Sequence, residues 1–115
     1  RLVTDVCVVL STAPSAEAGL GLGRRLVGER LAACVNVLPG ARSVFWWEGK
    51  VEESDEALVI IKTRRASFPA LARRLAELHT YSVPEVLALP VDTGAPAYVA
   101  WIGASVGSGG GEGAP

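Results

Sequence analysis

Residues 29–63, with the sequence ERLAACVNVLPGARSVFWWEGKVEESDEALVIIKT, decide the fold because they predict one unusually long β-hairpin. Residues 33–47 and 50–63 form its arms, each rich in Val, Ile, Leu, Phe or Trp, and Glu48-Gly49 forms the turn. An arm of roughly 14 residues at about 3.3 Å per residue spans about 46 Å, whereas a domain of this length is only about 35 Å across. We therefore expect part of the hairpin to bend back or to project beyond the domain, where its apolar residues need a partner chain.

Two adjacent tryptophans in the first arm support the same expectation. Neighbouring side chains of a strand point to opposite faces, so the indoles of Trp46 and Trp47 face opposite ways. One indole can enter the core of the domain, while the other needs a second buried surface and a partner for its N–H group.

On the amino-terminal side of the hairpin, the sequence predicts a strand and a helix. Residues 2–10 are almost continuously apolar, as in a central strand. Ser15 can cap the helix that follows, in which Leu22, Leu26 and Leu31 recur at helical spacing. Glycines lower the stability of this helix by roughly 1 kcal/mol each relative to alanine, so tertiary packing must hold it together. They stand at Gly19, Gly21, Gly23 and Gly28.

On the carboxyl-terminal side, the sequence predicts a second helix, a short strand and a third helix. Ser67 can cap the second helix, whose apolar stripe is made by leucines at positions 71, 75 and 78. Residues 83–91 predict a strand that is short or at an edge, because Pro84 and Pro90 cannot donate a hydrogen bond to a ladder. Residues 97–105 predict a final helix that carries Trp101.

This order of elements predicts an α+β domain with the ferredoxin-like split β-α-β arrangement, βαββαβ, followed by a C-terminal helix. The sheet is antiparallel and both principal helices cover one face, so the other face needs a cover, which self-association would supply. We expect one domain over residues 1–105 and a flexible, glycine-rich tail over residues 106–115.

Composition restricts the classes of partner. Half of the residues are hydrophobic and the formal net charge is -1, which argues against a disordered chain and against a nucleic-acid-binding surface. No apolar run is long enough to cross a membrane, so we expect no membrane partner and a cytoplasmic location. Cys7 and Cys34 lie in apolar runs without metal-type spacing and are interpreted as small buried hydrophobic residues.

Motifs for catalysis are weak. Gly19, Gly21 and Gly23 make GxGxG rather than the dinucleotide-binding GxGxxG, and no nucleophile motif accompanies the single histidine, His79. His79 is either a helix-terminal cation or a metal ligand. Carboxylates at positions 52, 53, 55 and 56 alternate between two strand faces and do not converge as hard-ion ligands do. We therefore predict that the chain is not an enzyme.

Several short sequences, in order and with matching gaps, resemble the CutA1 family of divalent-cation tolerance proteins over residues 3–104. They are Ser11-Thr12-Ala13-Pro14, residues 29–36 (ERLAACVN), Pro39-Gly40, Trp46-Trp47-Glu48-Gly49-Lys50, Lys62-Thr63, His79, Tyr81, Pro84-Glu85 and Trp101. The resemblance implies a cytoplasmic, non-enzymatic homotrimer with intersubunit strand pairing, with Trp46, Trp47 and Trp101 at the trimer interface. It also implies tolerance of copper or another divalent cation, and a likeness in fold to PII signalling proteins.

The resemblance carries expectations for the site as well. Ser11 stands where copper-binding relatives have a cysteine, and Leu78-His79 stands where they have two histidines, so His79 alone remains of three proposed ligands. An intersubunit cleft is expected to gather a polar set made of Glu48, Lys50, Lys62, Tyr81 and Glu85. Two alternatives to a metal-response protein stay open: a PII-like sensor that binds a small anionic ligand through Lys50 and Lys62, and a trimeric scaffold for protein partners.

Overall fold

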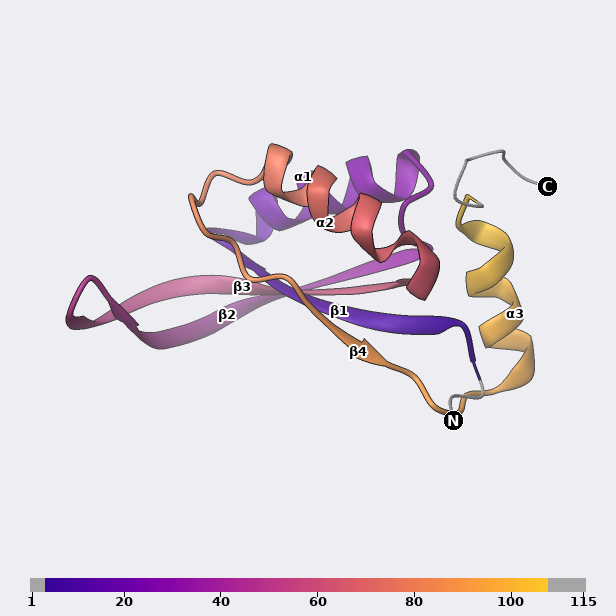
Figure 1. Ribbon diagram of the computed structural model, residues 1–115. Coiled ribbons are helices and arrows are strands. Elements are labelled where there is room, and N and C mark those ends of the chain that lie inside the picture. Colours follow the sequence, from indigo (N-terminus) through magenta and orange to yellow (C-terminus); the bar gives the residue numbers. More distant parts are fainter. Residues whose placement is uncertain (1–3, 108–115) are drawn as a thin grey trace.

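The computed structural model describes residues 4–107, which form a four-stranded antiparallel sheet with strand order β2-β3-β1-β4. Helices α1 and α2 lie side by side on one face, and α3 lies at the end opposite the hairpin tip (Figure 1). The α+β, ferredoxin-like prediction is therefore confirmed. In chain order the elements are β1 (Val6–Ala13), α1 (Ala16–Gly28), β2 (Cys34–Trp47), β3 (Lys50–Arg64), α2 (Phe68–Leu78), β4 (Leu87–Pro90) and α3 (Pro96–Ser105).

The β2–β3 hairpin projects beyond the body of the domain, as expected from its length (Figure 1). Strand β1 pairs only with residues 57–64 of β3, so the part of the hairpin nearer the tip has no third strand beside it. We call this part, residues 41–56, the overhang. The turn residues Glu48 and Gly49 have φ angles of 50° and 81°, which suit a tight two-residue hairpin turn. The molecule measures 46 Å along its longest axis and 27 Å and 22 Å along the others.

A bulge marks the base of the overhang. Leu38 pairs with Leu58 and Ala41 pairs with Glu56, so β2 has one more residue than β3 between these pairs. Gly40 takes up the bend with a φ of 87°, a conformation that glycine adopts without strain.

The core lies between the sheet and the two principal helices. Strand residues Val9, Val59 and Ile61 are fully buried against Leu26 of α1 and against Leu71 and Leu75 of α2. Burial raises the pKa of the Cys7 thiol beside them and keeps it protonated, as for a small hydrophobic residue.

Glycines bring α1 close to the sheet. A Cβ atom on Gly19 would lie 3.0 Å from Val37 and 3.3 Å from Val59, and one on Gly23 would lie 3.0 Å from Val35. Two of the glycines that weaken α1 locally therefore permit its close packing. A Cβ atom on Gly21 would meet nothing within 4 Å, so this glycine lowers the stability of the helix without permitting closer packing.

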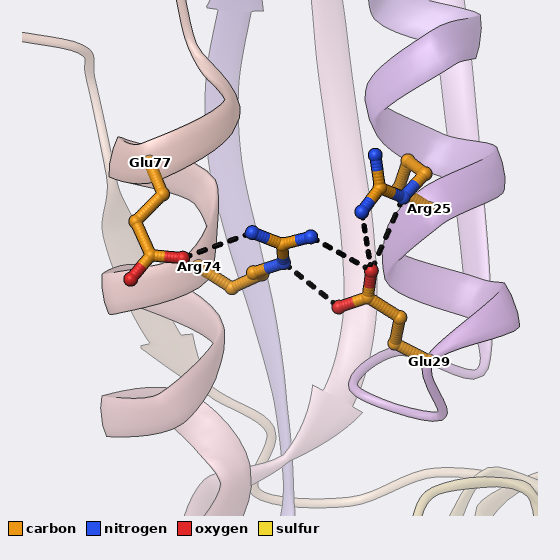
Figure 2. Close-up of polar contacts among 4 residues, drawn as sticks. All are labelled: Arg25, Glu29, Arg74 and Glu77. Carbon is orange, nitrogen blue, oxygen red and sulfur yellow. Dashed lines mark hydrogen bonds and ion pairs between the residues drawn. The ribbon is translucent and has the colours of Figure 1, made fainter.

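Ion pairs connect α1 and α2 on the outside of the helical layer (Figure 2). Arg74 donates to Glu29 from Nε and Nη2, at 2.9 and 3.1 Å, and to Glu77 from Nη1 at 2.9 Å. Arg25 adds a second cation beside Glu29. Hydrogen bonding from Arg74 lowers the pKa of Glu29 below its usual range, so the pair persists into mildly acidic solution.

Several boundaries differ from the prediction. The first strand begins at Val6 and continues to Ala13, whereas the fourth strand is limited to Leu87–Pro90, the residues that pair with β1. Ser15 caps α1 as predicted, accepting a hydrogen bond from the Ala18 N–H. Ser67 does not cap α2: a 3₁₀ turn, Arg65–Ser67, leads directly into the helix and leaves Ser67 helical and buried.

The prediction that one indole enters the core of the domain is wrong for the single chain. Trp46 is 75% exposed and Trp47 is 43% exposed, because both lie on the overhang, where no helix covers either face.

The C-terminal helix closes the other end of the sheet. Ile102 and Val106 are buried with Val6 and Ala33, and the Gly107 N–H donates to the Arg30 carbonyl. Residues 108–115 of the predicted tail lie outside the described residues. Within residues 4–107, no helix has the length and apolarity needed to cross a membrane.

Candidate functional site

A chain of hydrogen bonds ties the segment after α2 to the hairpin. His79, at the end of α2, donates from Nε2 to the Thr12 carbonyl at 2.7 Å and accepts the Tyr81 N–H at Nδ1 at 3.0 Å. Tyr81 then donates its hydroxyl to Glu56 of β3 at 2.7 Å, and Ser43 of β2 donates to the same carboxylate at 2.5 Å. This arrangement fixes the α2–β4 connection to the base of the overhang.

Tyr81 remains a hydrogen-bond donor over a wide pH range. Partial burial, the hydrogen bond to Glu56 and the charge of that carboxylate raise the pKa of Tyr81 to about 12. The phenol therefore stays protonated, and able to donate to Glu56, up to strongly alkaline pH.

A hollow of about 870 Å³ lies between the overhang and the Tyr81 segment. We call it the hairpin hollow. Its residues are Thr12 of β1, Ser43, Val44, Phe45 and Trp47 of β2, Glu52, Glu53, Ser54 and Glu56 of β3, and Tyr81, Ser82, Val83 and Glu85 of the α2–β4 connection. Four carboxylates and three aromatic rings line it, and its lining has no lysine, arginine or histidine.

The predicted cleft residues are only partly brought together within one chain. Tyr81 and Glu85 line the hairpin hollow. Glu48 and Lys50 lie at the hairpin tip, whereas Lys62 lies at the far end of β3, where it bonds the Asn36 side chain. Twelve residues of extended strand place the two lysines roughly 40 Å apart. A partner subunit would have to bring these groups to one cleft.

The predicted interface tryptophans occupy opposite ends of the molecule. Trp46 and Trp47 are exposed on the overhang, and Trp101 of α3 is 46% exposed and stacks on Tyr98 at 5.4 Å. Exposed rings of this size at both ends are available for contacts between chains.

The metal-ligand prediction meets a structural obstacle. Both ring nitrogens of His79 are engaged by backbone groups, and Ser11 is fully buried with its hydroxyl directed to the Thr12 carbonyl. Across residues 4–107, no three His, Cys, Asp or Glu side chains lie together in a way that could hold a metal ion. The donor set of one chain therefore does not fit a resident copper ion.

Sequence reasoning did not assign Ser43, Phe45 or Glu56 to a site. Alternation along β3 placed Glu52 and Glu56 on one face, and both line the hairpin hollow. The missing information was the path of the α2–β4 connection, which brings Tyr81 to Glu56 from 25 residues away.

Comparisons with known proteins match this fold and sequence. A model of the CutA1 divalent ion tolerance protein family matches residues 7–105. The divalent-cation tolerance protein CutA of Thermus thermophilus is 46% identical over 95 residues, which cover 83% of this chain and 92% of that protein. Rice chloroplastic Protein CutA 1 is 48% identical over 95 residues, and the chain spans 54% of its length.

Solved structures agree with the sequence comparison. The crystal structure of CutA from Xylella fastidiosa superposes with a TM-score of 0.87 at 42% identity, covering 90% of this chain and 99% of that one. CutA1 from Oryza sativa superposes with a TM-score of 0.86 at 46% identity, covering 90% and 94% of the two chains.

Proposed function

Because the chain belongs to the CutA1 divalent ion tolerance family, we propose that it is a homotrimeric, non-enzymatic metal-response protein that binds divalent cations weakly. The names of its relatives supply the association with divalent cations. The trimer, the weak binding and the absence of catalysis are parts of the proposal.

The observation that supports assembly is the amount of apolar surface that one chain leaves uncovered. Residues of the overhang and of the edge strand β4 are exposed, although they are large and hydrophobic. Large apolar side chains that are left exposed together mark contact sites between proteins. The exposed residues include Val44, Phe45, Trp46, Trp47 and Val51 on the overhang and Leu87 and Leu89 on β4.

Weak cation binding is consistent with the geometry around His79. A cation at either ring nitrogen has to replace the hydrogen bond to Thr12 or the one from Tyr81. That competition lowers affinity and fits a response to raised cation concentrations better than it fits a resident metal.

The absence of catalysis has support from the same residue. His79 gives both nitrogens to backbone groups, so in the described part of the chain it activates no serine or cysteine. We also propose a cytoplasmic location. Cys7 and Cys34 are free thiols, and a reducing compartment keeps thiols in this state.

The anionic-ligand alternative gains no support from one chain. Lys50 and Lys62 are far apart, and the hairpin hollow carries carboxylates, which repel anions.

Light scattering on the purified protein tests the assembly. We expect three times the chain mass at micromolar concentration, and a monomer mass would refute the trimer.

Calorimetric titration with Cu²⁺ and Zn²⁺ tests the binding of divalent cations. Saturable heat that is lost in His79→Ala is the expected result, and no saturable heat up to about millimolar metal would refute cation binding.

A further inference from the structure

Tyr81 fastens the α2–β4 connection at two points. Its N–H group donates to Nδ1 of His79 at 3.0 Å, and its hydroxyl donates to Glu56 at 2.7 Å. In the part of the chain that the structure describes, these are the two hydrogen bonds of residues 80–86, which are neither helical nor in a strand. Val86 adds packing against the buried core. The position of the connection therefore depends on the two bonds of Tyr81.

The partners of His79 determine where its ring carries hydrogen. The Thr12 carbonyl can only accept a hydrogen bond, so Nε2 has to carry hydrogen. The Tyr81 N–H can only donate, so Nδ1 has to offer a lone pair. Only one tautomer of the imidazole satisfies both partners. The bond to Tyr81 joins a side chain to the N–H of the second residue after it, which is the spacing of an Asx turn.

A divalent cation cannot bind this ring without releasing Tyr81. A cation at Nδ1 takes the lone pair that accepts the Tyr81 N–H. A cation at Nε2 displaces the hydrogen from that nitrogen, and a neutral ring then carries it on Nδ1, where it faces the Tyr81 N–H as donor against donor. The hydrogen bond between Tyr81 and His79 is lost in both cases.

We propose that His79 anchors the α2–β4 connection, and that cation binding at His79 competes with the attachment of this connection to the hairpin. The competition rests on the weak cation binding proposed above, whereas the anchoring does not. A bound cation leaves Tyr81 held only by Glu56, at the base of the overhang, and so loosens the contact between the connection and the hairpin. All of these bonds lie within one chain, so they do not depend on which surface a partner covers.

The ring can be reached from the helical side of the sheet. His79 lines a second hollow, of about 300 Å³, together with residues of α1 and Leu78 at the end of α2. A cation that enters there meets the ring away from the overhang. Access to His79 therefore does not require the hairpin hollow to stay open.

The competition has a consequence for affinity. Apparent affinity scales with the fraction of the protein that is competent to bind, which is here the fraction with a released connection. Tyr81→Phe removes the hydroxyl that reaches Glu56 but keeps the N–H group, so it should raise this fraction. Tyr81 is not a ligand in this proposal. A gain in affinity on its truncation separates competition from ligation.

Hydrogen exchange of the Tyr81 amide, measured by NMR on the metal-free protein in its native assembly, tests the anchor. His79→Ala should speed this exchange about fivefold, the factor that one ordinary hydrogen bond contributes. His79→Asn is the matched variant, because the asparagine oxygen can accept the N–H two residues on, and it should keep the exchange within about twofold of the parent. Unchanged exchange in His79→Ala, or equal acceleration in both variants, would overturn the anchor.

Calorimetric titration with Zn²⁺, which is redox-inactive and does not oxidise the free thiols, tests the competition. Tyr81→Phe should bind Zn²⁺ about fivefold more tightly than the parent, because it removes one hydrogen bond from the closed connection. Tyr98→Phe on α3 is the control and should leave the affinity unchanged. Heat that persists in His79→Ala comes from other sites and is subtracted.

The outcomes of the titration separate the two proposals. Equal affinity in Tyr81→Phe and the parent would overturn the competition, and weaker binding by Tyr81→Phe would overturn it by identifying the phenol as a ligand. No saturable heat in any of these proteins would refute the competition together with the proposed cation binding. The exchange experiment uses no metal, so it decides the anchor separately. Circular dichroism and light scattering on each variant establish that fold and mass are unchanged.

Discussion

Tyr81 joins the α2–β4 connection to the overhang through a single phenol. Its pKa in the folded chain is about 12, above the value of about 10 for a free tyrosine. A pKa that folding raises contributes stability below pH 10, and this contribution is lost as the pH rises through 12. Deprotonation of Tyr81 should therefore weaken its contact with Glu56 in strongly alkaline solution.

Substitution of Tyr81 by Phe should remove the late-titrating tyrosine. In an ultraviolet absorbance titration, the parent chain should show a tyrosinate component with a midpoint of about 12, and Tyr81→Phe should lack it. Tyr98→Phe is the control and should keep that component. If the component survives in Tyr81→Phe, the Glu56 contact does not exist in solution.

At this scale the sequence identified residues better than it identified their contacts. Ser15 was expected to cap a helix and does so. The intersubunit cleft expected to contain Tyr81 and Glu85 stays a prediction, although both residues line the hairpin hollow of one chain. The engagement of both His79 nitrogens could not be predicted, because it depends on the carbonyl of Thr12, distant in sequence.

Helix α1 contains glycines with opposite roles, and this difference is testable. Gly21→Ala should raise the free energy of unfolding by about 0.5–1 kcal/mol, because alanine favours the helix and its methyl group meets nothing within 4 Å. Gly23→Ala should lower it by about 1–3 kcal/mol, because the methyl group would lie 3.0 Å from Val35.

Urea denaturation of both variants at one protein concentration measures this difference, since assembly makes stability depend on concentration. Stabilisation by both substitutions would show that α1 can move away from the sheet at little cost.

Element types were predictable, but several ends were not. Periodicity identified α1, α2 and both hairpin arms, because each element buries one regular face. Ser67 was expected to cap α2, but the chain enters the helix through a 3₁₀ turn that a serine pattern does not reveal. The fourth strand is shorter than expected because residues 83–86 do not pair with β1.

For the whole molecule, the overhang is the expected assembly surface. Trp46→Glu should dissociate the proposed trimer, because it places a charge where a 75%-exposed indole needs cover. Leu20→Glu is the matched control: Leu20 is 43% exposed on α1, away from the hairpin. Light scattering should give a lower mass for Trp46→Glu only. Trimers in both variants would place the interface elsewhere.

The length of the arms predicted that the hairpin would bend back or project beyond the domain, and it projects. The hairpin hollow could not be predicted from the sequence. Its walls come from β1, β2, β3 and the α2–β4 connection, and the sequence does not show that these segments lie together.

The two-residue turn at Glu48 and Gly49 has a consequence for the order of folding. Trp47 pairs with Lys50 across a minimal loop, so the hairpin closes with little loss of chain entropy, on a scale of about 1–10 μs. Cys7 meets Pro90 only when nearly the whole chain is available. During synthesis the arms are therefore complete before β4 exists, and the newborn chain exposes the apolar overhang before its own sheet has closed.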